Sequence, residues 1–276
     1  MIARQKASSL NQQVQYGDTY GYLGSLGFVV MATDTVMQEN LRTLAPDGVS
    51  ISVAPVASPN EITVEGLRKH IDTMAKAASL IQPDAPPDLI CYACTSGSIV
   101  IGEHAVAEQI RLGAPKSQPM TLVTGVIDGL HALNAKSIVV ATPYIDEVNK
   151  LEYRFMTNQG FNVLDIKGMQ IDDGSIMGNI TPGYIKEFAL SLDRPEADAI
   201  FISCGGIRTI DILQEIEEEA NKPVICSNQA MMWSCLRRIN VSLTVKGYGR
   251  LFEIPEIADP CSILSLDDRI EEFNAL

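Results

Sequence analysis

Long hydrophobic runs are missing from this sequence of 276 residues. No apolar stretch reaches the roughly 18–20 residues that a bilayer-spanning helix needs. The N-terminal stretch MIARQKASSLNQQVQYGDTYGYLGS has no apolar core of the kind found in signal peptides, so residues 1–23 are expected to form a polar arm. These absences predict no membrane partner and a location in the cytoplasm, where thiols stay reduced.

Positive charge and histidine are also scarce. The chain has 21 Lys and Arg against 34 Asp and Glu, a formal net charge of −13. That balance disfavours nucleic acid as a partner, although one local pocket can differ from the net field. Only three histidines are present, and none stands in a metal-ligand motif, so no metal site is expected. A Walker sequence and a glycine-rich dinucleotide loop after a strand are likewise absent.

Short apolar runs of strand length alternate with longer amphipathic stretches. The runs are nearly continuous in Val and Ile, which is typical of parallel strands covered on both faces. They lie at residues 26–32, 49–56, 88–94, 120–125, 137–142, 161–166, 199–204 and 223–228. Helical patterns occur at residues 62–81, 144–160 and 210–222. The alternation predicts an α/β protein with parallel sheets.

An internal repeat is visible at a spacing of about 110 residues. At that shift Cys94 falls on Cys204, and both cysteines end an apolar strand before a turn of small residues. Asp34 falls on Tyr144 at the ends of two other strands. We therefore predict two similar halves of about four strands each. Since ligands of such sheets bind at the carboxyl ends of the strands, these four residues are expected in one cleft.

The segment LICYACTSGSIVIG permits a second interpretation, because Cys91 and Cys94 form a CxxC pair. A redox pair of the thioredoxin type opens a helix after its strand, and a zinc site needs two further ligands. Alternation along a strand points Cys91 away from the face of Cys94 and into the core. The repeat favours Cys204, rather than Cys91, as the partner of Cys94.

Two thiols on opposite sides of a cleft permit chemistry on a carbon acid. One thiolate can remove a proton while the other thiol delivers one to the opposite face, or one thiolate can add to an activated double bond. The enolate-like oxyanion formed in this way needs fixed hydrogen-bond donors. Small polar residues near the strand ends are candidates for that role, and for binding a substrate carboxylate: Thr95, Ser96, Thr124, Gly205, Gly206 and Ser227.

At these residues the chain resembles the aspartate/glutamate racemase superfamily, and within it the group of maleate cis-trans isomerases and arylmalonate decarboxylases. The segments that carry the resemblance are YACTSGS, ATPYIDEVN, FISCGG, KPVICSNQAMMW and GYGRLF, in the same order along residues 24–253. The resemblance implies two pseudosymmetric Rossmann-like or flavodoxin-like domains, with the active site in the cleft between them and no cofactor. It also implies that the tail returns to the first domain, which would then contain residues 1–118 and 226–276, with residues 119–225 as the second.

Matched by position, Cys94 and Cys204 correspond to the two catalytic cysteines of the maleate isomerases, and Tyr144 to their substrate-binding tyrosine. Arylmalonate decarboxylases have a glycine where Cys94 stands, which argues against decarboxylation here. Asp34 stands where the isomerases have an asparagine that binds a substrate carboxylate, and a second such asparagine falls near Gly174, with Asn179 close but not aligned. An anion at Asp34 suits an ammonium or hydroxyl group, and the ATDT and YACTSGSIVIG segments resemble an ectoine-utilisation branch of this group.

Several hypotheses follow for the function. The first is a cofactor-independent isomerase or racemase that acts on a small carboxylic acid, either maleate-like or amino-acid-like, and that forms a homo-oligomer. Within the same family the alternative is a decarboxylase. A non-catalytic protein that binds a small carboxylate in the same cleft, and a thiol redox protein that uses Cys91 and Cys94, are the alternatives from other classes.

Overall fold

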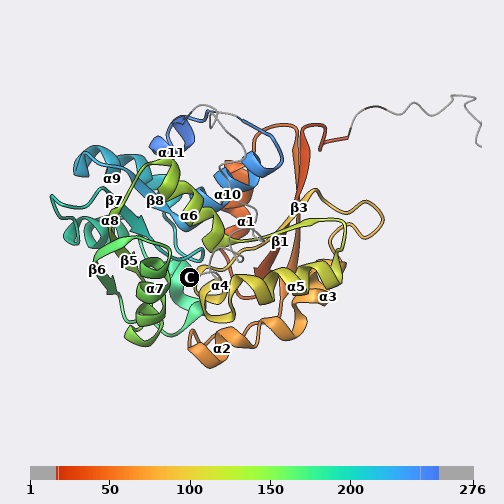
Figure 1. Cartoon of the computed structure of the whole chain (residues 1–276), viewed down its shortest axis with the longest axis horizontal. Helices are drawn as coiled ribbons and strands as arrows, with labels where there is room; N and C mark the ends of the chain where they lie inside the picture. The colour runs from red at the N-terminus through yellow and green to blue at the C-terminus, as the bar shows by residue number, and fades with distance from the viewer. Residues whose placement is uncertain (1–16, 18, 243, 255–276) are drawn as a thin grey trace, which may run out of the picture.

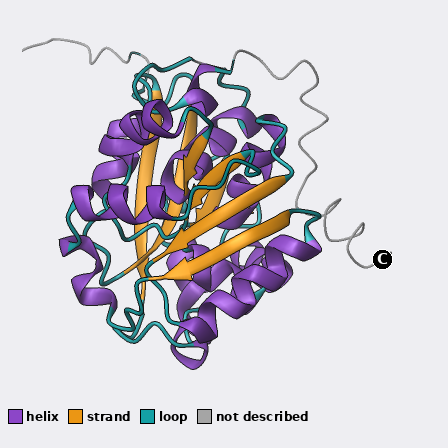
Figure 2. Cartoon of the chain, turned by 90° about the vertical axis from the view of Figure 1, so that its left-hand side faces the viewer, coloured by secondary structure: helices purple, strands orange, loops and turns teal. Residues whose placement is uncertain are grey.

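The computed structural model describes residues 17, 19–242 and 244–254 and contains two parallel four-stranded sheets (Figures 1 and 2). The first sheet has the order β2-β1-β3-β4. Its strands are β1 (Gly24–Met31), β2 (Val49–Val56), β3 (Leu89–Tyr92) and β4 (Gln118–Thr121). The second sheet has the equivalent order β6-β5-β7-β8. Its strands are β5 (Ser137–Thr142), β6 (Asn162–Gly168), β7 (Ala199–Ile202) and β8 (Val224–Cys226). The predicted α/β class with two similar halves is confirmed.

Helices cover both faces of the sheets, as parallel strands require. In the first half they are α1 (Met37–Leu44), α2 (Val64–Arg68), α3 (Ile71–Ser79), α4 (Thr95–Ile101), α5 (Glu103–Gly113) and α6 (Leu122–Ala132). Later in the chain they are α7 (Asp146–Asn158), α8 (Pro182–Ser191), α9 (Leu213–Ala220), α10 (Ser227–Arg238) and α11 (Arg250–Glu253), with short 3-10 helices η1 (Gly174–Asn179) and η2 (Ile210–Ile212). None of the helices in the described residues combines the length and hydrophobicity needed to cross a bilayer. The cytoplasmic location and the homo-oligomer stay predictions.

Two predicted elements differ from the structure in an instructive way. The helix expected over residues 62–81 is divided into α2 and α3, with His70 between them. The strand expected over residues 120–125 ends at Thr121, where α6 begins. The cause is a capping box in which the Thr121 and Thr124 side chains each bond the other residue's backbone N–H. A run that looks like strand by composition is therefore divided between a strand and a helix.

The repeat is present in the topology, but its spacing differs from strand to strand. With Cys94 matched to Cys204, β3 corresponds to β7 at the predicted 110 residues. In the ladders, however, Gly27 pairs with Ile90 whereas Val139 pairs with Ile200, so β1 corresponds to β5 at 112 residues. The ladder register therefore shifts the match of Asp34 to Tyr144 by two positions. Both residues nevertheless follow the carboxyl ends of equivalent strands.

The core continues from one half into the other. On one side of the first sheet, β3 residues Ile90 and Tyr92 pack with α3 and α5 in a cluster of their own. On the other side, Cys91 joins a large cluster that includes α6, α10 and the strands of the second sheet. Helix α10 packs against α6 and α1, so the chain returns to the first half after β8. The division into domains stays a prediction, and its boundary at residue 118 falls inside the range of β4.

Candidate functional site

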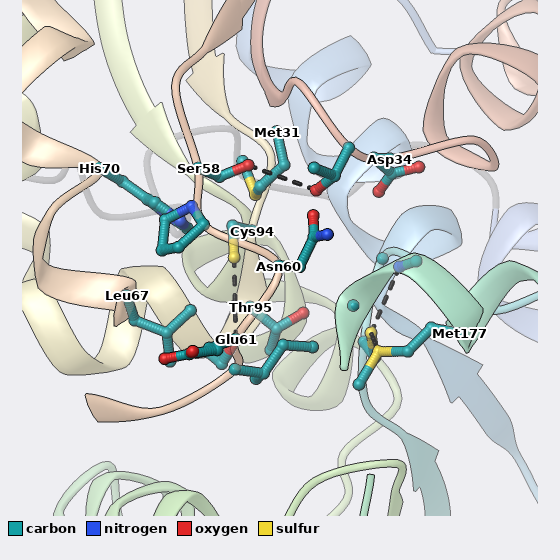
Figure 3. A pocket seen from close by; sticks show the side chains of 18 of the residues that line it. Met31, Asp34, Ser58, Asn60, Glu61, Leu67, His70, Cys94, Thr95 and Met177 are labelled. Atoms are coloured by element: carbon teal, nitrogen blue, oxygen red, sulfur yellow. Dashed lines mark hydrogen bonds between the residues drawn. The ribbon is translucent and has the colours of Figure 1, made fainter. Parts of the chain in front are cut away.

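One cavity of about 70 Å³ lies where the carboxyl ends of both sheets meet. Both repeat cysteines line it, together with residues from the loops after β1, β2, β5 and β7. Figure 3 shows Cys94 near the middle of this cavity, with His70 on one side of it and Asp34 and Met177 on the other. Of the predicted site residues, the lining contains Asp34, Cys94, Thr95, Ser96, Tyr144, Cys204, Gly205 and Gly206.

Cys94 is held at the junction between β3 and α4. Its backbone is extended and it occupies the N-cap position of α4. The half-buried thiol accepts a hydrogen bond from the backbone N–H of Gly97 at 3.3 Å, and Ser96 Oγ lies 3.8 Å from its sulfur. Burial raises the pKa of Cys94, while hydrogen bonds from Gly97, Ser96 and Tyr92 oppose that rise. The sulfur thus faces the cavity with several donors around it that favour the thiolate.

A buried histidine and tyrosine stand behind Cys94. His70 Nδ1 lies 2.6 Å from the Tyr92 hydroxyl, which in turn is a hydrogen-bond partner of the Cys94 thiol. A Cβ atom on Gly97 would collide with the Tyr92 hydroxyl and lie 3.0 Å from the Cys94 sulfur, so glycine leaves room for this contact. Burial lowers the pKa of His70 to about 4, so its imidazole is neutral at neutral pH. Sequence reasoning missed His70, because no motif near it indicates the contact.

Cys204 follows β7 in a backbone conformation that is unusual for a residue with a side chain. Its φ is +107°, in the region that favours glycine. The strain is held in place by two hydrogen bonds: the Cys204 backbone N–H donates to Ser227 Oγ at 2.9 Å, and the Gly206 backbone N–H donates to the Cys204 sulfur at 3.3 Å. Burial raises the pKa of Cys204 to about 12. Strained backbone that is fixed in this way is typical of functional sites.

Tyr144 lies between Cys204 and Ser96. Its side chain is buried at the wall of the cavity, and its hydroxyl is a hydrogen-bond partner of both Cys204 and Ser96. The local chain holds it in position, since the Tyr144 backbone N–H donates to the Thr142 hydroxyl at 3.1 Å. Burial raises the pKa of Tyr144 well above its usual value, and the Cys204 thiol adds to that effect. Tyr144 therefore keeps its proton and can act as a donor.

Thr95 and Ser227 form a bridge between the halves. The Thr95 hydroxyl donates to Ser227 Oγ at 2.8 Å, and the same Ser227 oxygen accepts the Cys204 backbone N–H. Ser227 is fully buried at the start of α10 and does not line the cavity, so the structure places it behind Cys204 rather than at the substrate. The bridge therefore fixes the backbone of Cys204 relative to Thr95, the residue that follows Cys94.

Thr124 lies away from the cavity as well. The capping box makes it part of α6, where its buried hydroxyl bonds Thr121 and Glu103. The structure therefore does not bring Thr124 to the site, in contrast to the sequence prediction. Gly205 and Gly206 are at the cavity wall, and a Cβ on Gly205 would lie 2.6 Å from Met37 Cε.

Asp34 has one carboxylate oxygen fixed and one directed at the cleft. Its Oδ1 accepts the backbone N–H groups of Val36 and Met37, both at 2.7 Å, at the start of α1. A Cβ built on Gly206 would lie 3.7 Å from Asp34 Oδ2 and equally far from Cys204 Sγ. Burial raises the pKa of Asp34, and the two backbone hydrogen bonds oppose the rise. The Asp34 charge in turn raises the pKa of both cysteines.

Two loops at the wall of the cavity are joined by backbone pairing. The Gly174 N–H donates to Asn60 O at 2.6 Å, and the Ile62 N–H donates to Asp172 O at 2.7 Å, on either side of a bridge between Glu61 and Asp173. We call these paired segments, residues 60–62 and 172–174, the clasp. Asn60, Glu61, Ile62 and Gly174 line the cavity, whereas Asn179 does not. Sequence reasoning missed the loop from the first half, since it carries no motif.

Negative charge predominates among the residues that line the cavity. Its acidic lining residues are Asp34 and Glu61, and its described lining includes neither lysine nor arginine. Within residues 17, 19–242 and 244–254, no group of three His, Cys, Asp or Glu side chains is placed to hold a metal ion. Cys91, Cys226 and Cys235 are buried outside the cavity, and Cys261 lies outside the described residues.

Comparison with known proteins gives a consistent result. The family model described as arylmalonate decarboxylase matches residues 26–252. The maleate isomerase of Nocardia farcinica is 30% identical over 176 residues, which cover 61% of this chain and 70% of that protein. The arylmalonate decarboxylase of Bordetella bronchiseptica is 29% identical over 136 residues, which cover 48% of this chain and 57% of that protein.

Among solved structures, the chain is similar to the Nocardia farcinica maleate cis-trans isomerase with a covalently bound succinylcysteine intermediate. The two share 25% sequence identity at a TM-score of 0.78, with 83% of this chain and 98% of the other covered. The resemblance inferred from the motifs is thereby confirmed at the level of the family, while the ectoine-utilisation branch stays a prediction.

Proposed function

Since the chain belongs to the arylmalonate decarboxylase family, we propose that it is a cofactor-independent isomerase or racemase that acts on a small carboxylic acid. One observation carries the proposal: Cys94 and Cys204, which follow equivalent strands of the two sheets, line the same cavity. The similarity to maleate isomerases, one of which forms a succinylcysteine intermediate, supports this reaction class.

The two cysteines have different surroundings, and this favours different roles. Cys94 is half-buried and has Gly97, Ser96 and Tyr92 as hydrogen-bond donors to its sulfur. Cys204 is buried, and its pKa is raised to about 12. We therefore assign Cys94 as the thiolate that attacks the substrate or takes its proton. Cys204 is the thiol that donates a proton from the opposite side.

The proposed step conserves atoms and charge. In racemisation, the Cys94 thiolate takes the proton, the C–H electron pair moves into the carbon–carbon bond of an enediolate, and the Cys204 S–H proton then goes to the other face of that carbon. In cis-trans isomerisation, the thiolate adds to the double bond, and the bond that remains rotates before the thiolate leaves. Both routes place negative charge on a carboxyl oxygen.

Donors at the cavity can stabilise that oxyanion. Tyr144 keeps its proton and lines the wall next to Cys204. Thr95 and Ser96 are the first two residues of α4, whose backbone N–H groups have no acceptor within the helix. Donors that are already fixed in a buried site lose little on reorganisation, which is why such groups dominate many rate enhancements.

Two other functions remain as alternatives. Decarboxylation is the activity that gives the family its name. By the motif match, however, Cys94 stands where the arylmalonate decarboxylases have glycine. A non-catalytic protein that binds a small carboxylate would have no need of two thiols in one cavity or of a strained backbone at one of them.

The test is to replace each cysteine with serine and to measure turnover of a panel of small carboxylic acids. We expect Cys94→Ser and Cys204→Ser each to lose at least about a hundredfold in kcat, because each removes a group that transfers a proton or forms a bond. The matched control is Cys235→Ser, since that buried thiol lies outside the cavity. Full activity in both site variants, with unchanged melting temperatures, would exclude this function.

The panel also separates the two reactions. Incorporation of deuterium from heavy water at a tetrahedral α-carbon supports racemisation. A thioether adduct on Cys94, trapped in the Cys204→Ser variant and located by peptide mass spectrometry, supports cis-trans isomerisation. If a compound of the panel binds tightly, but no compound incorporates deuterium or forms an adduct, the binding-protein alternative is supported.

A further inference from the structure

We propose that the substrate is a small carboxylic acid that carries a protonated amine on the reacting carbon or on its neighbour, and that Asp34 binds this ammonium group. The inference rests on the proposed isomerase function and names the substrate class of the same site. It starts from the charges that surround the cavity and from the position of one carboxylate oxygen.

The charge of the lining disfavours a dicarboxylate. Asp34 and Glu61 are the acidic residues of the described lining, and the lining includes neither lysine nor arginine. A substrate with two carboxylates would bring two more negative charges into this partly buried space without a cation opposite them. Buried charges need a partner of opposite sign, so a substrate with an ammonium group fits the site better.

Asp34 is built as a fixed acceptor. The two backbone N–H groups of Val36 and Met37 hold its Oδ1, so the orientation of the carboxylate is set before a ligand binds. Its Oδ2 points towards Gly206, as the distance of 3.7 Å to a Cβ built there shows. Both hydrogen bonds that hold this carboxylate go to Oδ1, and among the described residues none is bonded to Oδ2. A ligand donor can therefore bond Oδ2 without disturbing α1.

The position of Oδ2 relative to Cys204 gives the place of the amine. Asp34 Oδ2 and Cys204 Sγ each lie 3.7 Å from the position that a Cβ on Gly206 would occupy, so the two atoms are separated by no more than twice that distance. A sulfur in contact with a reacting carbon is roughly 3–3.5 Å from it, and an ammonium nitrogen bonds a carboxylate at about 2.8 Å. With one carbon–nitrogen bond between, these lengths span about 7 Å when extended. An amine on the reacting carbon, or on the next carbon of a bent chain, therefore fits between the two atoms.

An ammonium group at this place also assists the thiols. The Asp34 charge raises the pKa of both Cys94 and Cys204 and so opposes thiolate formation in the empty cavity. A bound cation neutralises Asp34 and removes that opposition. The titratable residues around Cys94 are Tyr92, Cys204 and Tyr144, together with Asp34, Glu61 and His70 in the cavity lining. Asp34 is the carboxylate among them whose charge raises the pKa of Cys94 and Cys204. The proper substrate would thus activate the nucleophile, and a substrate without an amine would not.

The experiment compares two ligands of equal shape. 2-Aminoisobutyrate carries an ammonium group and has no α-proton, so it binds without reacting, and pivalate replaces that ammonium group with a methyl group. Dissociation constants are measured by calorimetry with the full chain. We expect 2-aminoisobutyrate to bind at least tenfold more tightly than pivalate. Equal affinity of the two ligands, or tighter binding of pivalate, would overturn the inference.

Two variants locate the effect. In Asp34→Asn the preference for the ammonium ligand should fall by at least tenfold, while the affinity for pivalate should stay the same or increase. The matched control is Asp72→Asn, which removes the same charge from an exposed position on α3 outside the cavity and should keep the preference. An unchanged preference in Asp34→Asn would also overturn the inference. Because binding is measured without turnover, these outcomes are independent of the cysteine variants that test the isomerase function.

Discussion

The strained backbone at Cys204 leads to a quantitative prediction about stability. At an ordinary extended position, glycine is less stable than alanine, because glycine loses more conformational freedom on folding and buries no methyl group. Cys94 has an extended backbone, with φ at −142°, so this order should hold there. Cys204 has φ at +107°, a conformation that glycine adopts freely and alanine does not. The cost of glycine relative to alanine should therefore differ between the two cysteine positions.

The expected difference follows from the strain alone. A residue with a side chain in a disfavoured backbone region costs on the order of 1–3 kcal/mol. The entropy and methyl contributions occur at both positions and largely cancel when the two sites are compared. The destabilisation caused by glycine relative to alanine should thus be smaller at Cys204 than at Cys94 by about 1–3 kcal/mol. If glycine equals or exceeds alanine in stability at Cys204, this strain is the reason.

Four variants measure the effect: Cys94→Ala, Cys94→Gly, Cys204→Ala and Cys204→Gly. Urea unfolding can be followed by the fluorescence of Trp233, the single tryptophan, which is buried in α10. For a domain of this size, 1 kcal/mol corresponds to a shift in melting temperature of roughly 2–4 °C, which thermal melts resolve. If glycine costs as much at Cys204 as at Cys94, the backbone at Cys204 is not strained, and the reasoning is refuted.

Three further predictions concern residues around the thiols. Burial raises the pKa of Glu152, a residue of α7, to about 7, so the folded state holds this proton more tightly than the unfolded state does. The free energy of unfolding should therefore fall as the pH rises from about 4.5 to 7. Glu152→Gln should remove up to about 3 kcal/mol of this fall, as measured by urea unfolding at several pH values, and an equal pH dependence in both proteins would contradict the prediction. Tyr92→Phe removes a hydrogen bond that lowers the pKa of Cys94, so alkylation of Cys94 by iodoacetamide near pH 8 should become slower, and an unchanged rate would rule out the contact. Ser227→Ala leaves the buried backbone N–H of Cys204 without its acceptor and should cost about 1–3 kcal/mol in unfolding free energy; Ser227→Thr is the control that keeps the hydroxyl, and equal stability of all three proteins would refute the bridge.

The sequence predicts the strands and the pair of cysteines because these depend on local composition. Buried parallel strands are continuous in Val and Ile, and a cysteine that ends such a strand lies at a sheet edge wherever the other strands are. That reasoning placed Cys94 and Cys204 at the ends of β3 and β7, as the structure has them. The topology repeats for the same reason, since each half presents the same order of elements.

The rest of the site depends on contacts that composition does not encode. Thr124 looks like a strand-end donor, yet reciprocal capping with Thr121 makes it the third residue of α6. Ser227 looks like a residue that faces the substrate, yet its oxygen is occupied by two bonds from within the protein. His70 is connected to the site by its contact with the Tyr92 hydroxyl, from a residue 22 positions along the chain. Such features need three-dimensional packing, and a single sequence shows no pattern for them.

The clasp has a consequence for the fate of protons during turnover. Residues 60–62 and 172–174 pair with each other through backbone hydrogen bonds at the wall of the cavity. A hydrogen taken from the substrate is held on a thiol at this wall, and it returns to the substrate if transfer back is faster than exchange with water. An isotope placed on the reacting carbon can then return to the same molecule several times before release. Loosening the clasp should then increase the loss of label to water, and the isotope content of the product measures that change.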